Sequence, residues 1–248
     1  MAFFRLPSSV LMALNCGSLT QAALPWMRGR SWQWNPMPQF LASRGYVVIE
    51  PEFRGSTGFG ARHFRAGWKQ WGQAMQDDLV DALAWAVREG HADGKRVCIA
   101  GGSYGGYAVL MGLARHGEQF RCGAAWSSVT DPRLLFKWRR DSAVGSEDRE
   151  YSYPLLIGDP VADAAMLDAN TPVLLAARIK TPVFLAHGGA DERVPLVHGE
   201  RMRDALVAAG RPAEWVVYSD EGHGWLKLET RLDFAKRLEA FLARHLGP

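Results

Sequence analysis

The sequence has few cysteines, no long hydrophobic run and no excess of charge of one sign. The cysteines Cys16, Cys98 and Cys122 form an odd number without the paired spacing of a zinc site or a disulfide framework, so we expect buried, inert thiols. The 29 basic and 26 acidic residues leave a net charge of +3 and are spread along the chain. This distribution predicts no nucleic-acid partner, and the short basic run at 137–140 is interpreted as a solvated helix end.

No apolar segment is long enough to cross a membrane, and the apolar run at 10–14 is shorter than the core of a signal peptide. We therefore expect a cytoplasmic protein without a membrane partner. The chain has 248 residues, of which 48% are hydrophobic, so it can bury a large core and is expected to form one domain. Whether it forms a homo-oligomer stays open.

Strand-like and helix-like patterns alternate along most of the chain. The apolar patterns predict strands at 46–49, 96–100, 122–126, 182–186 and 214–218, and helices at 73–89, 104–116, 196–209 and 231–245. This order is typical of an α/β fold with a mostly parallel sheet and helices on both faces. The segment 131–171 contains glycines and prolines, and we expect it to form helices and loops over one end of the sheet.

A glycine-rich stretch, GGSYGGY at 101–107, follows the predicted strand 96–100 and opens the predicted helix 104–116. Gly-x-Ser-x-Gly between a strand and a helix is the nucleophile elbow of α/β-hydrolases, in which a strained turn lifts the serine hydroxyl above the sheet. The sequence therefore predicts Ser103 as a nucleophile. The backbone N–H of Tyr104, at the start of the helix, is placed to face a developing oxyanion.

A nucleophilic serine needs a histidine as base and an acid that orients it, and in α/β-hydrolases these follow in the order Ser, Asp or Glu, His. His223 lies in a glycine-flanked loop directly after the predicted strand 214–218, and Asp191 lies in the loop after the predicted strand 182–186. Because parallel strands end at one edge of a sheet, both loops reach the edge that carries Ser103.

The other downstream histidines are weaker candidates for the base. His187 ends a strand but precedes the acid, and the remaining three lie in helical stretches, where we expect them at the surface: His116, His198 and His245. The aromatic residues near the irregular segment are interpreted as core rather than as a substrate pocket: Trp126, Phe136 and Trp138.

Several stretches together resemble the catalytic domain of the prolyl oligopeptidase family of serine peptidases, which includes acylaminoacyl peptidases and dipeptidyl peptidases. They are RGSTGFG at 54–60, AG at 66–67 with WG at 71–72, GGSYGGY at 101–107, HGGADERVP at 187–195 and EWVVYSDEGHG at 214–224. The likeness runs from about residue 39 to the C-terminus. It implies Ser103 as nucleophile, Asp191 as acid, His223 as base and the Tyr104 N–H as one oxyanion donor.

Two features depart from the family. The family carries a β-propeller ahead of this domain, and none is visible in the sequence. The family also has a glycine-containing loop ahead of the position that matches Trp26, which supplies a second oxyanion donor, whereas this chain reads TQAALPW at 20–26. Losing one such donor costs about 10²- to 10³-fold in turnover, so weak activity on peptides is expected.

The resemblance implies an α/β-hydrolase domain at 25–248, preceded by an atypical segment at 1–24. The expected activity is that of a serine peptidase that cleaves short peptides through a Ser-His-Asp triad and an acyl-enzyme, without metal or organic cofactor. Two alternatives stay open. One is an esterase with the same triad, and the other is a truncated, weakly active or inactive remnant with an incomplete oxyanion hole.

Overall fold

The computed structural model describes residues 10–14, 35–137 and 148–247 of the chain. Its sheet has six parallel strands in the order β2-β1-β3-β4-β5-β6. The strands are β1 (Val10–Leu14), β2 (Val47–Ile49), β3 (Val97–Gly102), β4 (Cys122–Trp126), β5 (Val183–Gly188) and β6 (Glu214–Tyr218). The predicted α/β fold with a parallel sheet is therefore confirmed.

The helices fall between the strands in the predicted alternation. They are α1 (Pro36–Ser43), α2 (Ala61–Arg65), α3 (Ala74–Arg88), α4 (Tyr104–His116), α5 (Leu134–Lys137), α6 (Tyr153–Leu156), α7 (Ala164–Ala169), α8 (Val197–Ala208) and α9 (Leu228–Leu246). Three shorter helical turns are η1 (Gly117–Gln119), η2 (Asp148–Ser152) and η3 (Pro172–Arg178). Helix α4 and strands β4 and β6 begin and end at the residues that the sequence predicts.

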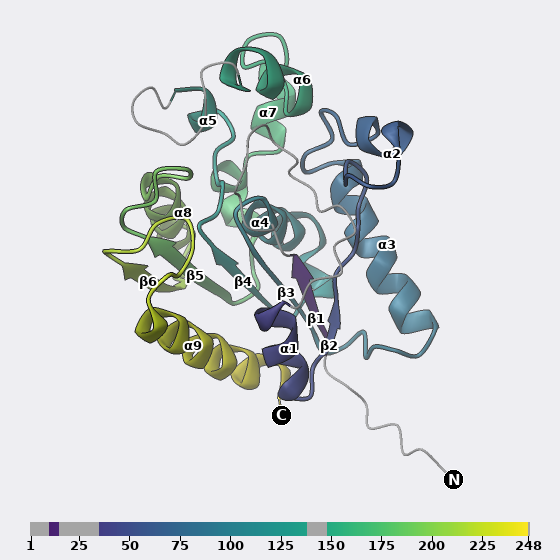
Figure 1. The fold of residues 1–248 in the computed structure, drawn as a ribbon, viewed down its shortest axis with the longest axis vertical. Helices are drawn as coiled ribbons and strands as arrows, with labels where there is room; N and C mark the ends of the chain where they lie inside the picture. Colours follow the sequence, from purple (N-terminus) through teal and green to yellow (C-terminus); the bar gives the residue numbers. More distant parts are fainter. Residues whose placement is uncertain (1–9, 15–34, 138–147, 248) are drawn as a thin grey trace.

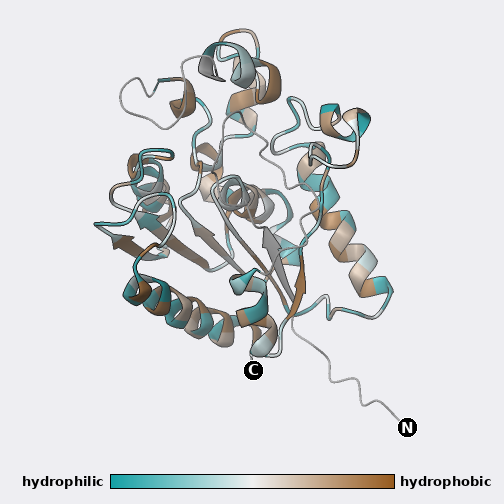
Figure 2. Cartoon of the chain, viewed as in Figure 1, coloured by the Kyte–Doolittle hydropathy of each residue, from teal (hydrophilic) through white to brown (hydrophobic). Residues whose placement is uncertain are grey.

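Both faces of the sheet are covered by helices, as Figure 1 shows. Because successive side chains of a strand point to opposite faces, Val97 and Ile99 of β3 pack into a core shared with α3, α4 and α8, whereas Cys98 and Ala100 pack against α1 and α9. Strand β5 is buried along its whole length as well, whereas β6, at the edge of the sheet, is half-buried or exposed although Figure 2 shows it with apolar residues. Burial on both faces leaves the strand ends as the places where polar loops can gather.

The segment 131–171 behaves as predicted over its described part. Helices α5, α6 and α7 lie together beyond one end of the sheet (Figure 1), and Phe136 packs edge-on against Tyr153 with ring centroids 5.7 Å apart. Trp126, at the end of β4, packs against Phe234 of α9 with ring centroids 5.3 Å apart. These two aromatic residues are thus packing residues, as predicted, and Trp138 lies outside the described residues.

Strand β1 comes from the segment 1–24, in which the sequence showed no likeness to the family. It pairs with β2 on one side and with β3 on the other, with Leu14 in register with Gly101. Residues 10–14 are therefore part of the same sheet as the rest of the chain. The end of β1 lies beside the end of the strand that leads to Ser103.

Two of the three cysteines form a pair that the sequence analysis did not predict. Cys98 and Cys122 occupy register-paired positions on β3 and β4, with Cα atoms 4.8 Å apart and their sulfur atoms joined in a disulfide. Both side chains are buried, as predicted, but they are not separate thiols, because strand register, which the spacing along the chain does not reveal, places them side by side. Cys16 lies outside the described residues.

None of the helices in the described part of the chain is long and apolar enough to cross a membrane.

Candidate active site

Ser103 lies at the turn from β3 into α4. Its φ of 58° and ψ of −119° place a non-glycine residue in a strained backbone region, and its N–H donates to the carbonyl of Trp126 on β4 at 2.9 Å. The preceding Gly102 is enclosed by the ring of Trp126, whose Nε1 atom would lie 2.3 Å from an added Cβ. The turn is thus held against the end of β4 by this hydrogen bond and this close contact.

His223 joins Ser103 to Asp191. The Oγ atom of Ser103 lies 2.9 Å from Nε2 of His223, and Nδ1 of the same ring lies 2.8 Å from Oδ2 and 3.1 Å from Oδ1 of Asp191. These residues come from three loops, which follow β3, β5 and β6 at the same edge of the sheet. The structure brings together the three side chains that the sequence predicted.

The carboxylate of Asp191 is wholly buried and has hydrogen-bond partners on both oxygens. Oδ1 accepts the backbone N–H groups of Arg193 at 3.0 Å and Val194 at 2.8 Å, and Oδ2 faces His223. Burial by itself raises the pKa of Asp191, but the bonds from His223 and Val194 outweigh it and hold the pKa below its ordinary value. The carboxylate is therefore ionised at neutral pH and accepts a hydrogen bond from the N–H at Nδ1 of the His223 ring.

The loops that carry Asp191 and His223 touch through their backbones. Gly189 donates its N–H to the carbonyl of Tyr218 at 2.8 Å, and Ala190 donates its N–H to the carbonyl of Glu221 at 2.9 Å. A Cβ atom at Gly188 would lie 2.0 Å from the carbonyl oxygen of Gly222 and 2.4 Å from that of Glu221. The missing side chain of Gly188 thus lets the two loops approach closely enough to place acid beside base.

Replacing Gly188 by alanine is expected to destabilise the protein by about 1–3 kcal/mol, because the new methyl group meets backbone rather than a movable side chain. The same clash pushes the loop of His223 outward and lowers turnover of the folded fraction. Gly117→Ala is the control, because its added Cβ would lie 3.5 Å from the nearest atom, Oγ1 of Thr181. Urea denaturation and turnover measure both effects, and a Gly188→Ala protein as stable and active as the control would contradict the interpretation.

Glu221 anchors the other end of the loop that carries His223. The side chain is buried, and its carboxylate accepts the N–H groups of Leu226 at 2.8 Å and Lys227 at 2.9 Å, just before α9 begins. Burial raises the pKa of Glu221, but these backbone bonds and a bond from Thr230 lower it below its ordinary value. The sequence analysis missed this residue because only the fold shows that its side chain turns inward.

The histidines outside the triad differ from the prediction in one case. His198 lies on α8, as expected, but it is buried, and its Nδ1 accepts the N–H of Thr130 at 3.2 Å, so the prediction of a surface position is wrong. Burial lowers the pKa of His198 to about 3. His116 and His245 are partly exposed. The spacing of a helix shows which residues share a face, but not what a neighbouring loop covers.

His187, set aside as a base, lies close to Asp191. Its ring is buried at the end of β5, and Nε2 lies 2.8 Å from the carbonyl oxygen of Val194 and 3.7 Å from Oδ2 of Asp191. It does not contact Ser103. The sequence indicated only that His187 ends a strand four residues before the acid, and not that its ring lies beside the carboxylate.

Of the two positions considered for the oxyanion hole, the structure describes Tyr104 and not the stretch 20–26. Tyr104 is the first residue of α4, so its N–H lies at the positive end of the helix dipole, next to Ser103. The stretch 20–26, in which the sequence suggested a missing second donor, lies outside the described residues.

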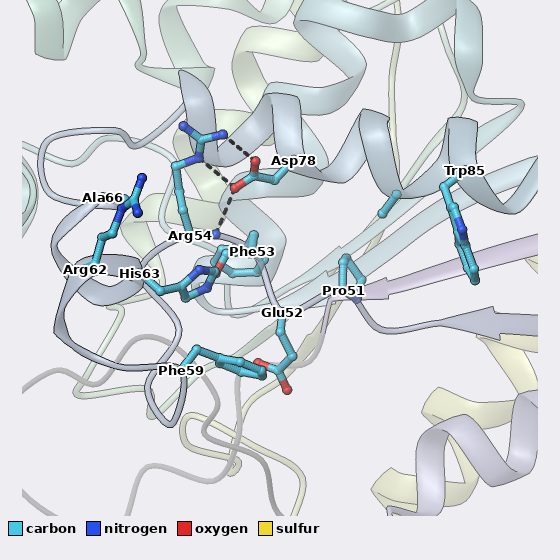
Figure 3. Close-up of a pocket in the computed structure, with 11 residues that line it drawn as sticks. Pro51, Glu52, Phe53, Arg54, Phe59, Arg62, His63, Ala66, Asp78 and Trp85 are labelled. Atoms are coloured by element: carbon cyan, nitrogen blue, oxygen red, sulfur yellow. Dashed lines mark hydrogen bonds and ion pairs between the residues drawn. The ribbon is translucent and has the colours of Figure 1, made fainter.

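A cavity of about 710 Å³ lies between the 51–66 segment and α3, shown in Figure 3. Arg54 and Asp78 form a two-pronged ion pair in it, with distances of 2.8 Å and 2.6 Å, so this guanidinium is already neutralised. Phe53 connects the cavity wall to Tyr104, with ring centroids 5.4 Å apart. The triad residues do not line it. Within the described residues no cluster of histidine, cysteine and acidic side chains could hold a metal ion.

Comparison with known proteins identifies the family. The profile of the prolyl oligopeptidase family matches residues 32–248. Dipeptidyl aminopeptidase BIII of Pseudoxanthomonas mexicana is 37% identical over 227 residues, which cover 90% of this chain and 32% of the relative. Dipeptidyl peptidase family member 6 of Caenorhabditis elegans is 32% identical over 216 residues, covering 86% of this chain and 29% of the relative. The chain thus spans about a third of the length of these relatives.

Solved structures show the same fold. A puromycin-hydrolyzing peptidase of Mycobacterium tuberculosis superposes with a TM-score of 0.85 and 26% identity, over 98% of this chain and 35% of that one. The acylaminoacyl peptidase of Pyrococcus horikoshii superposes with a TM-score of 0.84 and 20% identity, over the whole of this chain and 38% of that one. Both superpositions confirm the α/β-hydrolase fold that the sequence patterns predict.

Proposed function

This chain belongs to the prolyl oligopeptidase family, and from that premise we propose that it is a serine peptidase that hydrolyses short peptides. The observation that carries the proposal is the ring of His223, which lies 2.9 Å from the Ser103 hydroxyl and 2.8 Å from the buried Asp191 carboxylate. A hydroxyl, an imidazole and an ionised carboxylate in this order form the machinery of acyl transfer. The names of the relatives agree with peptide substrates.

In the proposed reaction the Ser103 oxygen attacks the carbonyl carbon of the peptide bond while Nε2 of His223 takes the hydroxyl proton. Asp191 keeps the other proton on Nδ1 and stabilises the imidazolium that forms. The Tyr104 N–H donates to the oxygen on which negative charge develops. His223 then gives its proton to the leaving amine, and an acyl-enzyme is left on Ser103. Water, deprotonated by the same ring, releases the acid and restores the serine.

Paired substrates test the proposal. A short peptide anilide and an ester with the same acyl group share one acyl-enzyme but differ in leaving group, so the ratio of their rates reports on attack and on the oxyanion hole. A peptidase cleaves both bonds. We expect the anilide to react more slowly than the ester, because its poorer leaving group makes cleavage depend more on the oxyanion hole, for which the sequence predicts one donor fewer. Cleavage of the ester alone would favour an esterase. A protein that cleaves neither substrate and does not react with a fluorophosphonate would contradict the proposal.

A further inference from the structure

His187 is a buried titratable group that the proposed reaction does not use. It is 1% exposed and follows Val183 and Leu185 on the face of β5 that packs against the core beneath α8. Its ring lies against Trp215 of β6, with ring centroids 6.5 Å apart. An imidazole in so apolar a place is costly unless its polar atoms are satisfied.

The polar contact of His187 leads to Asp191. Nε2 lies 2.8 Å from the carbonyl oxygen of Val194, so in the neutral ring Nε2 carries the proton and donates it. The N–H of the same Val194 donates to Oδ1 of Asp191 at 2.8 Å. One residue, Val194, is thus held by His187 at its carbonyl oxygen and holds the acid through its N–H.

We propose that His187 is a positioning residue, which clamps Val194 through a neutral Nε2–H donor and so holds Asp191 in line with His223. The chain of contacts runs from His187 to the Val194 carbonyl, from the Val194 amide to Asp191, and from Asp191 through His223 to Ser103. The inference rests on the proposed function only for the consequence in turnover. The geometry of the acid loop itself is independent of it.

The charges around the ring favour the neutral form. Burial lowers the pKa of His187 below its ordinary value, although the Val194 carbonyl and the negative charges of Asp191 and Glu200 act in the other direction. The positive form of His223 opposes a charge on His187, and the neighbouring His198 has its own pKa lowered by burial. A neutral His187 leaves the whole negative charge of Asp191 to His223. The 3.7 Å between Nε2 and Oδ2 is a close approach and not an ion pair.

Two amide substitutions test the clamp. Glutamine at position 187 can place an N–H donor near the position of Nε2, whereas asparagine is one methylene shorter and cannot reach the Val194 carbonyl. For H187N we expect kcat per active site to fall by about 10²-fold, the scale of a 1 Å misplacement, with KM unchanged. For H187Q most of this loss is recovered. Active sites are counted by fluorophosphonate titration, which removes any loss caused by unfolding.

The pH profile separates positioning from packing. When Asp191 moves away, the imidazolium of His223 loses its partner, so the acid limb of kcat/KM moves to lower pH in H187N and stays in place in H187Q. The control is H198Q, which alters a histidine that is as buried as His187 but bonds to Thr130 instead of the acid loop. We expect H198Q to keep the acid limb and the kcat per active site of the unaltered protein.

A readout without turnover covers the case in which the protein hydrolyses neither substrate. The proton on Nδ1 of His223 gives a downfield NMR signal that depends on its bond to Asp191. This signal should shift or vanish in H187N and persist in H187Q and H198Q, whether or not the protein is a peptidase. The inference would be overturned if H187N kept the NMR signal and the acid limb of the unaltered protein. It would also be overturned if H187Q showed the same change as H187N.

Discussion

Replacing Ser103 by alanine is expected to lower kcat by about 10⁶-fold, the loss seen when the nucleophile of such a triad is removed. Among the residues that the structure describes, the hydroxyl that contacts His223 is that of Ser103, and the acyl-enzyme cannot form without its oxygen. Burst kinetics with an activated ester measure the loss of the acyl-enzyme. Mass spectrometry after fluorophosphonate treatment measures the loss of labelling at position 103. The variant should unfold at the same denaturant concentration as the unaltered protein.

Ser127 provides a matched control for this variant. Both serines are buried, both follow strands, and both have positive φ, 58° for Ser103 and 45° for Ser127. Within the described part of the chain the buried Ser127 hydroxyl has no hydrogen-bond partner, whereas that of Ser103 contacts His223. Ser127→Ala should therefore keep labelling and turnover. If it lost labelling while Ser103→Ala kept it, the nucleophile would be assigned to the wrong serine.

The parts of the fold that follow from local pattern were predictable. The boundaries of α4, β4 and β6 come from apolar spacing together with glycine and polar breaks, so they depend on neighbours in the chain. Ser103, Asp191 and His223 were predictable for a related reason, because each directly follows a strand and parallel strands end at one edge. The rule that parallel strands end at one edge was therefore enough to predict that three distant loops form one site.

The parts that depend on long-range contacts were not predictable. β1 is a five-residue run that looks unremarkable until it pairs with β2 and β3. The pairing of Cys98 with Cys122 depends on strand register, and the burial of His198 depends on the loop of Thr130 that covers it. The clamp of His187 on Val194 needs the turn after β5 to fold back over its own strand. Periodicity describes one element at a time and does not contain these contacts.

Replacing Asp191 by asparagine is expected to lower kcat by about 10⁴-fold, the cost of holding the imidazole in the wrong tautomer. The structure indicates how the amide would sit. Two N–H groups, those of Arg193 and Val194, point at Oδ1, so the asparagine keeps its oxygen there and turns its NH₂ group toward His223. That NH₂ donates to Nδ1, which must then be unprotonated, and the ring proton moves to Nε2, where it blocks removal of the Ser103 proton.

The Asp191→Asn protein should fold, because the backbone donors keep an acceptor and the side-chain volume is unchanged. Asp220→Asn is the control, because Asp220 lies near the same site but is exposed and pairs with Lys227 at the surface. Surface changes of this kind stay within about 0.5 kcal/mol, so its turnover should match the unaltered protein. Steady-state kcat at the optimal pH, divided by the fluorophosphonate-titrated site concentration, gives the comparison. A loss of kcat of less than tenfold in Asp191→Asn would show that another group orients His223. The role of Asp191 as the acid, and that of His187 in positioning it, would then be contradicted.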